Sequence, residues 1–193
     1  MSYEYSEDGL VEAASQEVLE DLGWVVETAW QKEKFTDAED KQRTQGLLGR
    51  INKSEVLLVR YLLIALRSLN PDLPETAYQQ GVDLLSSSIA DKHLAAINKQ
   101  KYQYLLDGVP VSYQDDKGIL QKKKLRVFNF AEPGENDFRA VRQLEVVGQL
   151  YNRRSDIVGF VNGIPLVFFE LKAHHTDLRH AYDDNLSDYK DAI

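Results

Sequence analysis

The chain begins with hydrophobic positions at helical spacing. The apolar stripe consists of Leu10, Val11, Ala14, Val18, Leu19 and Leu22. Ser6 or Asp8 can cap the start of this helix, and Gly23 can end it. Residues 24–26 are consecutive apolar residues directly after the glycine, which predicts a strand. The pattern therefore predicts a helix that leads into a strand.

The middle of the chain predicts more helices. Residues 31–50 are polar and have no period, which indicates a loop or a weak helix. Closely spaced apolar residues follow and stop at Asn70, which precedes a proline that cannot continue a helix. The expected helices cover residues 53–69, 75–85 and 91–106. Together they form a helical insertion at about residues 53–106.

Past Gly108 the hydrophobic pattern changes to alternation broken by turns, which is typical of strands. The last such segment, RSDIVGFVNGIPLVFFELK at residues 154–172, has two apolar runs around a turn and predicts a hairpin. Helices followed by strands in a chain of 193 residues predict a single α/β domain over residues 1–193. Because the chain stops without a terminal signature, we expect it to be a fragment of a longer subunit.

Composition limits the cellular compartments and the binding partners to be expected. The chain has no cysteine, which excludes disulfides and thiolate metal sites and favours a reducing, cytoplasmic location. No apolar run approaches the length of a membrane span, so no membrane contact is expected. A net charge of −8 argues against broad electrostatic binding to nucleic acid. The basic clusters at residues 122–126 and 153–154 fit solvated strand ends as well as local DNA contacts.

Three charged residues interrupt the apolar hairpin. Side chains alternate along a strand, so Glu170 and Lys172 share one face. Asp156 reaches that face only if the turn has the correct length. We therefore predict a three-residue turn over residues 161–163, with Phe160 paired to Ile164 and Gly163 in a left-handed bulge. A two-residue turn would send the Asp156 side chain to the opposite face.

The three charges suit phosphodiester hydrolysis. Two neighbouring carboxylates repel each other unless a cation lies between them, and oxygen ligands with water suit Mg²⁺. Asp156 and Glu170 are therefore the predicted metal ligands, and Lys172 can orient or deprotonate water or offset phosphate charge. An ordinary pair of charges at a strand end is the alternative. Charges that violate the apolar pattern of a hairpin favour a functional site.

The hairpin resembles the PD-(D/E)xK nuclease motif, in the form found at the N-terminus of the restriction (R) subunit of type I restriction enzymes. The segments YQYLLDGVPV, LRVFNF and NDFRAVRQLEVVG extend the resemblance over essentially the whole chain. On the motif, Asp156, Glu170 and Lys172 match the three catalytic positions, while Ser155 replaces the motif's proline. Members often add a helical glutamate, which Glu12 matches; a solvated surface glutamate is the alternative.

The same resemblance extends to a further motif and to the partners. Asn185 and Tyr189 match a Gln-x-x-x-Tyr motif that supports the site or contacts DNA, although asparagine shortens the reach of the amide. The resemblance implies a restriction-endonuclease-like mixed central sheet flanked by helices. It also implies cleavage of unmodified double-stranded DNA with Mg²⁺, or Mn²⁺ as a substitute. Modification and specificity subunits would complete the complex. The chain contains no P-loop. ATP would therefore act only through a motor outside this chain.

Two other functions fit parts of the sequence. A stand-alone repair or junction nuclease would share the same core, but it should show a dominant basic groove that the acidic composition does not favour. A non-catalytic docking module would keep the fold and use the helical insertion to hold partners. Retention of the Asp, Glu and Lys together argues against a module that has lost its chemistry.

Overall fold

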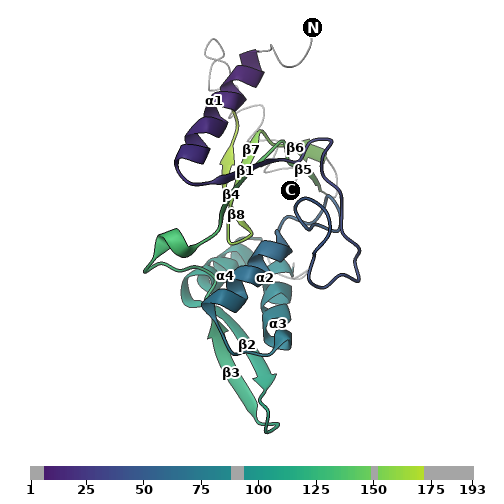
Figure 1. The fold of residues 1–193 in the computed structure, drawn as a ribbon. Coiled ribbons are helices and arrows are strands. Elements are labelled where there is room, and N and C mark those ends of the chain that lie inside the picture. Colours follow the sequence, from purple (N-terminus) through teal and green to yellow (C-terminus); the bar gives the residue numbers. More distant parts are fainter. Residues whose placement is uncertain (1–6, 88–93, 149–151, 172–193) are drawn as a thin grey trace.

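A four-stranded mixed sheet forms the centre of the computed structural model, which describes residues 7–87, 94–148 and 152–171 (Figure 1). The strands, in spatial order, are β1 (Val25–Thr28), β4 (Phe138–Arg142), β7 (Ile157–Val161) and β8 (Ile164–Phe169). β1 is parallel to β4, and the other two pairs are antiparallel. The expected α/β fold with a mixed central sheet is therefore confirmed.

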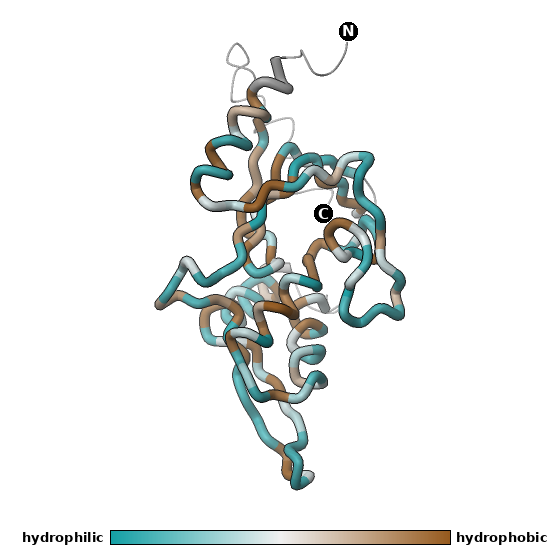
Figure 2. The backbone as a smooth tube through the Cα atoms, viewed as in Figure 1, coloured by the Kyte–Doolittle hydropathy of each residue, from teal (hydrophilic) through white to brown (hydrophobic). Residues whose placement is uncertain are grey.

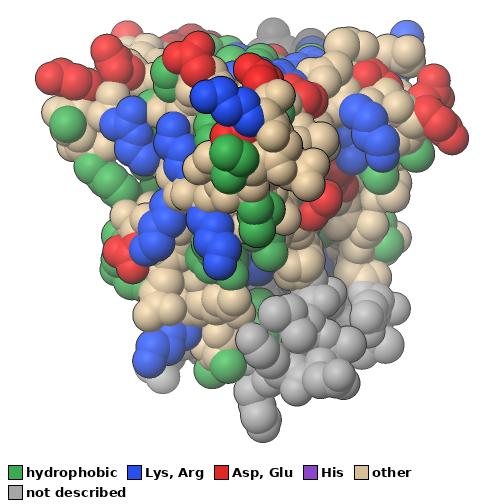
Figure 3. Space-filling view, turned by 90° about the horizontal axis from the view of Figure 1, so that it is seen from below, with side chains coloured by type: hydrophobic (Ala, Val, Ile, Leu, Met, Phe, Trp, Pro, Cys, Tyr) green, Lys and Arg blue, Asp and Glu red, His purple; other side chains and the backbone are tan. Residues whose placement is uncertain are grey.

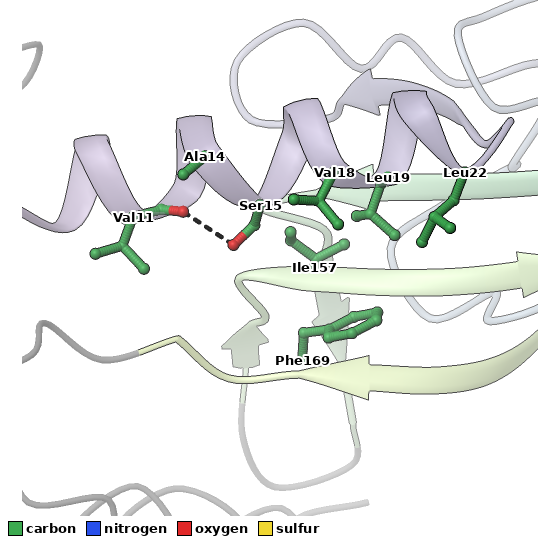
Figure 4. A pocket seen from close by; sticks show the side chains of 8 residues that line it. All are labelled: Val11, Ala14, Ser15, Val18, Leu19, Leu22, Ile157 and Phe169. Carbon is green, nitrogen blue, oxygen red and sulfur yellow. Dashed lines mark hydrogen bonds between the residues drawn. The ribbon is translucent and has the colours of Figure 1, made fainter.

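Helix α1 (Glu7–Asp21) lies along one face of the sheet, where Leu19 of its apolar stripe is buried with Ala140 and Ile157, whereas Val18 and Leu22 remain exposed. Gly23 adopts a left-handed φ of 84° and ends the helix, and the Trp24 N–H then bonds back to the Leu19 carbonyl. Figure 4 shows the side chains of α1 directed toward Ile157 and Phe169. Between them lies an apolar groove of about 570 Å³.

The opposite face of the sheet packs against an irregular segment instead of a helix. Leu48 and Leu58 are fully buried against Val158 and Phe160 of β7. The preceding polar residues form no regular helix, so of the two predicted forms for residues 31–50 the loop is correct. Figure 2 shows much of this segment in the hydrophilic colour.

The helical insertion and a long hairpin share a separate core. This unit consists of α2 (Val59–Leu69), α3 (Glu75–Ser86), α4 (Leu94–Asp107), β2 (Val109–Gln114) and β3 (Leu120–Leu125). In Figure 1 the β2–β3 hairpin projects away from the central sheet. Two smaller elements complete the part of the fold that the structure describes, a 3₁₀ turn (Pro133–Glu135) and an antiparallel pair of β5 (Glu145–Val147) with β6 (Asn152–Arg154). Within the described residues, no helix is long and apolar enough to cross a membrane.

The first helix of the insertion is shorter than its apolar pattern predicts. It begins at Val59 and not near residue 53. The Asn52 side chain accepts hydrogen bonds from the N–H groups of Ser54 and Glu55, and the Leu58 N–H donates to the Gly163 carbonyl. These tertiary and local bonds replace the helical ones that the segment would otherwise form.

The predicted three-residue turn in the β7–β8 hairpin is wrong. Val161 pairs with Ile164, and Asn162 and Gly163 form a two-residue turn with φ values of 50° and 77°. The register then shifts between Phe160, which pairs with Pro165, and Gly159, which pairs with Val167. Because proline has no N–H to donate, a bulge beside it removes few hydrogen bonds between the two strands. This bulge restores the face that the two-residue turn would have lost.

Gly163 should be the glycine of this hairpin least tolerant of substitution. A Cβ at this position would overlap the Leu58 carbonyl oxygen and lie 2.7 Å from the Leu62 nitrogen, both backbone atoms. We expect Gly163→Ala to lower the free energy of unfolding by about 2–4 kcal/mol, measured by urea denaturation. Gly118→Ala is the matched control, because Gly118 has a φ of 75° in open space and should cost only about 1 kcal/mol. Equal losses in the two variants would contradict the packing argument.

The Asp40 carboxylate accepts several hydrogen bonds within the polar loop, and its titration at low pH can test them. Its carboxylate accepts bonds from the hydroxyl and N–H of Thr44, the Thr36 hydroxyl and the Gln42 N–H. These bonds, with the Thr44 hydroxyl the largest cause, lower the pKa of Asp40 to about 2. A lowered pKa means that this stabilisation is complete above the ordinary value of 3.8 and is lost as the pH falls through about 2. An NMR titration should find this midpoint, and Thr44→Ala should raise it; a midpoint near 3.8 in the wild type would refute the bonding pattern.

Candidate nuclease site

Asp156 and Glu170 adjoin the last pair of the β7–β8 ladder, one residue outside each strand. The last pair of the ladder joins Ile157 to Phe169, and these two acidic residues are the next step on each strand. Directly opposite side chains in an antiparallel pair point to the same face. The Leu171 N–H donates to Asp156 Oδ2 at 2.6 Å, which holds the carboxylate beside the end of β8. Extended by one residue, this register would set two of the three predicted motif residues, Asp156 and Glu170, on one face at the end of the hairpin.

Glu12 approaches the same end of the sheet from α1. It is 4% exposed, so the alternative of a solvated surface glutamate is wrong. Arg142 at the end of β4 donates to Glu12 Oε2 at 2.9 Å, and the Gln143 amide donates to both carboxylate oxygens at 2.8 and 3.0 Å. Burial of this carboxylate is compensated by charge and by hydrogen bonds. Both carboxylate oxygens of Glu12 thus accept hydrogen bonds from the protein.

Gln143 connects these groups and was not among the predicted site residues. Its side chain bonds to Glu12, and its N–H donates to the Asp156 carbonyl at 2.8 Å. Its φ of 51° is uncommon for a residue other than glycine, and such strain clusters at functional sites. A lone glutamine after an alternating run gives no periodic signal, so only its contacts reveal it.

The donor chemistry at this end of the sheet fits a hard divalent cation. Asp156 and Glu170 offer carboxylate oxygens, which Mg²⁺ and Mn²⁺ prefer together with water. In the part of the chain that the structure describes, no group of three or more acidic, histidine or cysteine residues could hold a metal. Among the described residues, Asp156 and Glu170 are the candidate ligands that the motif predicts.

The remaining predicted site residues lie outside the described part of the chain. These are Lys172, Asn185 and Tyr189. Their assignments rest on the sequence motif. Glu170 lies just beyond the end of β8, so Lys172 follows it at a distance of two residues along the chain.

Positive charge near the site is local. Arg154 at the end of β6 stacks on Trp30, with its guanidinium carbon 4.2 Å from the centre of the indole ring. On the face seen in Figure 3, at the end of the molecule where the β2–β3 hairpin projects, basic and acidic side chains are interspersed. This mixed surface agrees with the net charge of −8.

Comparisons with known proteins match the whole length of the chain. The model of the family described as "Type I restriction enzyme R protein N terminus" matches residues 4–193. The HindI type I restriction enzyme endonuclease subunit of Haemophilus influenzae is 36% identical over 188 residues, 95% of this chain. A putative MjaIXP endonuclease subunit of Methanocaldococcus jannaschii is 25% identical over 191 residues, 96% of the chain. In each case the chain spans 17% of the relative's length.

Proposed function

We propose that this chain, which belongs to the family of type I restriction enzyme R protein N termini, is the DNA-cleaving domain of a restriction enzyme subunit. The observation that carries the proposal is the hairpin register. Its last pair, Ile157 with Phe169, supports a site in which Asp156 and Glu170 face each other, and Gln143 links Asp156 to Glu12 at the same end of the sheet. Relatives named as endonuclease subunits support the same reaction class.

Each residue has a separate role in this proposal. Asp156 and Glu170 hold a divalent cation, Mg²⁺ or Mn²⁺, through their carboxylate oxygens. When bound, the cation lowers the pKa of water and neutralises charge on a phosphate oxygen. Lys172 orients the attacking water or neutralises the scissile phosphate. Glu12 acts as a positioning residue, because its oxygens hold Gln143, which in turn holds the Asp156 backbone.

The wider context is proposed from the family to which the chain belongs. The chain spans 17% of each relative, and we propose that the complete subunit also contains an ATP-driven motor. Modification and specificity subunits would supply target recognition, so that unmodified double-stranded DNA is delivered to this acidic domain. Such an enzyme acts in the cytoplasm, which agrees with the absence of cysteine.

Lys172→Ala in the assembled enzyme tests the proposed chemistry. We expect loss of nicking and of double-strand cleavage on supercoiled DNA, because the charge that acts on water or phosphate is removed. ATP hydrolysis and binding of Mn²⁺ should remain, since neither requires this side chain. Persistent cleavage in Lys172→Ala, Asp156→Ala and Glu170→Ala alike would show that the hairpin charges are structural, and a docking module would then be the better account.

A further inference from the structure

A second cavity lies beside the candidate nuclease site. It has a volume of about 270 Å³ and is lined by residues of the turn after β1 and of the β4–β5 connection. The lining side chains that matter here are Trp30, Gln31, Phe35, Lys53, Gln143 and Glu145. This volume is near the lower end for small-molecule pockets, which suits one planar heterocycle.

The cavity directly adjoins the motif residues. Gln143 lines it, and the N–H of the same residue donates to the Asp156 carbonyl at 2.8 Å. The Gln143 side chain also bonds to the buried Glu12. Gln143 is therefore shared by the wall of the cavity and by the backbone contact to the predicted metal ligand Asp156.

Backbone strain marks the walls of this cavity. Gln31 has a φ of 58° and Gln143 a φ of 51°, both in the left-handed region. Left-handed residues other than glycine cost free energy and persist where the surrounding structure requires them. Two such glutamines lie in the wall of this one small cavity, so surrounding contacts must hold its backbone shape.

The aromatic residues of the cavity are only partly covered by protein. Trp30 is 39% exposed and Phe35 38% exposed, so both leave ring surface available. Arginine lies against each ring, with Arg154 at 4.2 Å from the Trp30 centre and Arg50 at 5.9 Å from the Phe35 centre. Exposed aromatic rings with neighbouring arginine are typical of surfaces on which single-stranded bases stack.

The charges inside the cavity favour a neutral occupant over a phosphate. Lys53 pairs with Glu145 at 2.6 Å, and Glu33 pairs with the buried Arg50 at 2.6 Å. Positive charge in the wall is therefore balanced by carboxylates, while Gln31 and the Lys53–Glu145 pair offer donors and acceptors to the edge of a base. This chemistry matches a nucleobase better than the sugar–phosphate backbone.

We propose that this cavity binds an unstacked nucleobase of the DNA strand next to the scissile phosphate. The proposal rests on the proposed nuclease function and adds a subsite to it. Stacking on Trp30 holds the base, and anchoring the neighbouring nucleotide positions the phosphate at Asp156 and Glu170. Because every base has a stacking face, the subsite requires no particular sequence.

Fluorescence quenching of Trp30 tests the subsite without any cleavage. A short single-stranded DNA is titrated into the chain in the presence of a chelator, and an abasic strand of the same length is titrated in parallel. The chain has two tryptophans, so Trp24 remains as an internal reference in Trp30→Leu. We expect quenching by the base-bearing strand only, its loss in Trp30→Leu, and an affinity lowered about tenfold in that variant.

Two results would contradict the proposed base-binding subsite. Neither depends on whether the chain is a nuclease. Equal quenching by the abasic strand, or quenching that survives in Trp30→Leu, would show that no base enters the cavity. Phe35→Leu provides a second variant at the other aromatic residue of the cavity wall and should weaken binding of the base-bearing strand alone. Asp156→Asn should keep the quenching; if that variant still cuts DNA, the nuclease assignment fails while the subsite stands.

Discussion

Replacing Asp156 with asparagine should reduce DNA cleavage by the assembled enzyme about a thousandfold or more. The change keeps the size of the side chain and an oxygen that can accept the Leu171 N–H bond, so the hairpin should stay folded. It removes one of the two carboxylates that the register brings together. Loss of a charged ligand weakens binding of the cation, which supplies several kcal/mol of charge stabilisation in the reaction. Nicking of supercoiled DNA measures the effect.

Glu17→Gln is the matched control for the loss of charge. Glu17 lies on α1 with an exposed side chain, and its neutralisation changes the net charge by the same amount. We expect cleavage at the wild-type rate in this variant. Cleavage by Asp156→Asn within about tenfold of the wild type would contradict the assignment of this carboxylate as a ligand.

Arg50→Leu should produce the largest loss of stability. Arg50 is fully buried and donates to both oxygens of Glu33 at 2.8 and 2.6 Å. It also donates to the carbonyls of Glu55 and Glu145 at 3.0 Å each. Removal of one partner of a buried ion pair leaves an uncompensated charge, which costs about 3–5 kcal/mol. We expect a decrease of this size in the free energy of unfolding from urea denaturation.

Arg67→Ala shows what an exposed pair of the same type contributes. Arg67 pairs with Glu75 at 2.7 Å, but both side chains are largely accessible to water. Exposed ion pairs contribute about 0–1 kcal/mol, so this variant should remain close to the wild type. Similar losses in Arg50→Leu and Arg67→Ala would mean that Arg50 does not anchor the segment between β1 and α2.

Helix and strand identity could be predicted well where the hydrophobic period was clear. The α1 stripe and Gly23 correctly predicted a helix that ends before β1. The predicted start of α2 was wrong because the Asn52 side chain accepts the N–H groups of Ser54 and Glu55, and the Gly163 carbonyl accepts that of Leu58. Hydrogen bonds from distant segments do not appear in a local period, so they cannot be predicted from it.

In the β7–β8 hairpin, the predicted facing of Asp156 is produced by a different turn from the one predicted. The requirement that Asp156 share a face with Glu170 led to a predicted three-residue turn, whereas a two-residue turn and a bulge beside Pro165 produce the same facing. The hydrophobic pattern cannot distinguish a three-residue turn from a two-residue turn with a bulge. Relative to a plain two-residue turn, each shifts the register by one residue and so puts Asp156 on the same face. Proline within the strand was the available signal for the bulge.

The surroundings of the motif were beyond local sequence reasoning. Glu12 could be proposed from its position on α1, but its burial depends on Arg142 and Gln143, which lie about 130 residues later in the chain. Arg50 likewise sits in a polar segment that resembles a surface loop, yet it is fully buried. Long-range contacts determine the burial of polar residues, whereas period and composition are local.

Calorimetric titration of Mn²⁺ into the wild type and into Asp156→Asn, with Glu17→Gln as the control, tests the central claim most directly. If Asp156 and Glu170 hold the cation, the wild type and Glu17→Gln should bind it alike, and Asp156→Asn should bind at least about tenfold more weakly. Equal binding by all three proteins would contradict a metal site at the end of the β7–β8 hairpin.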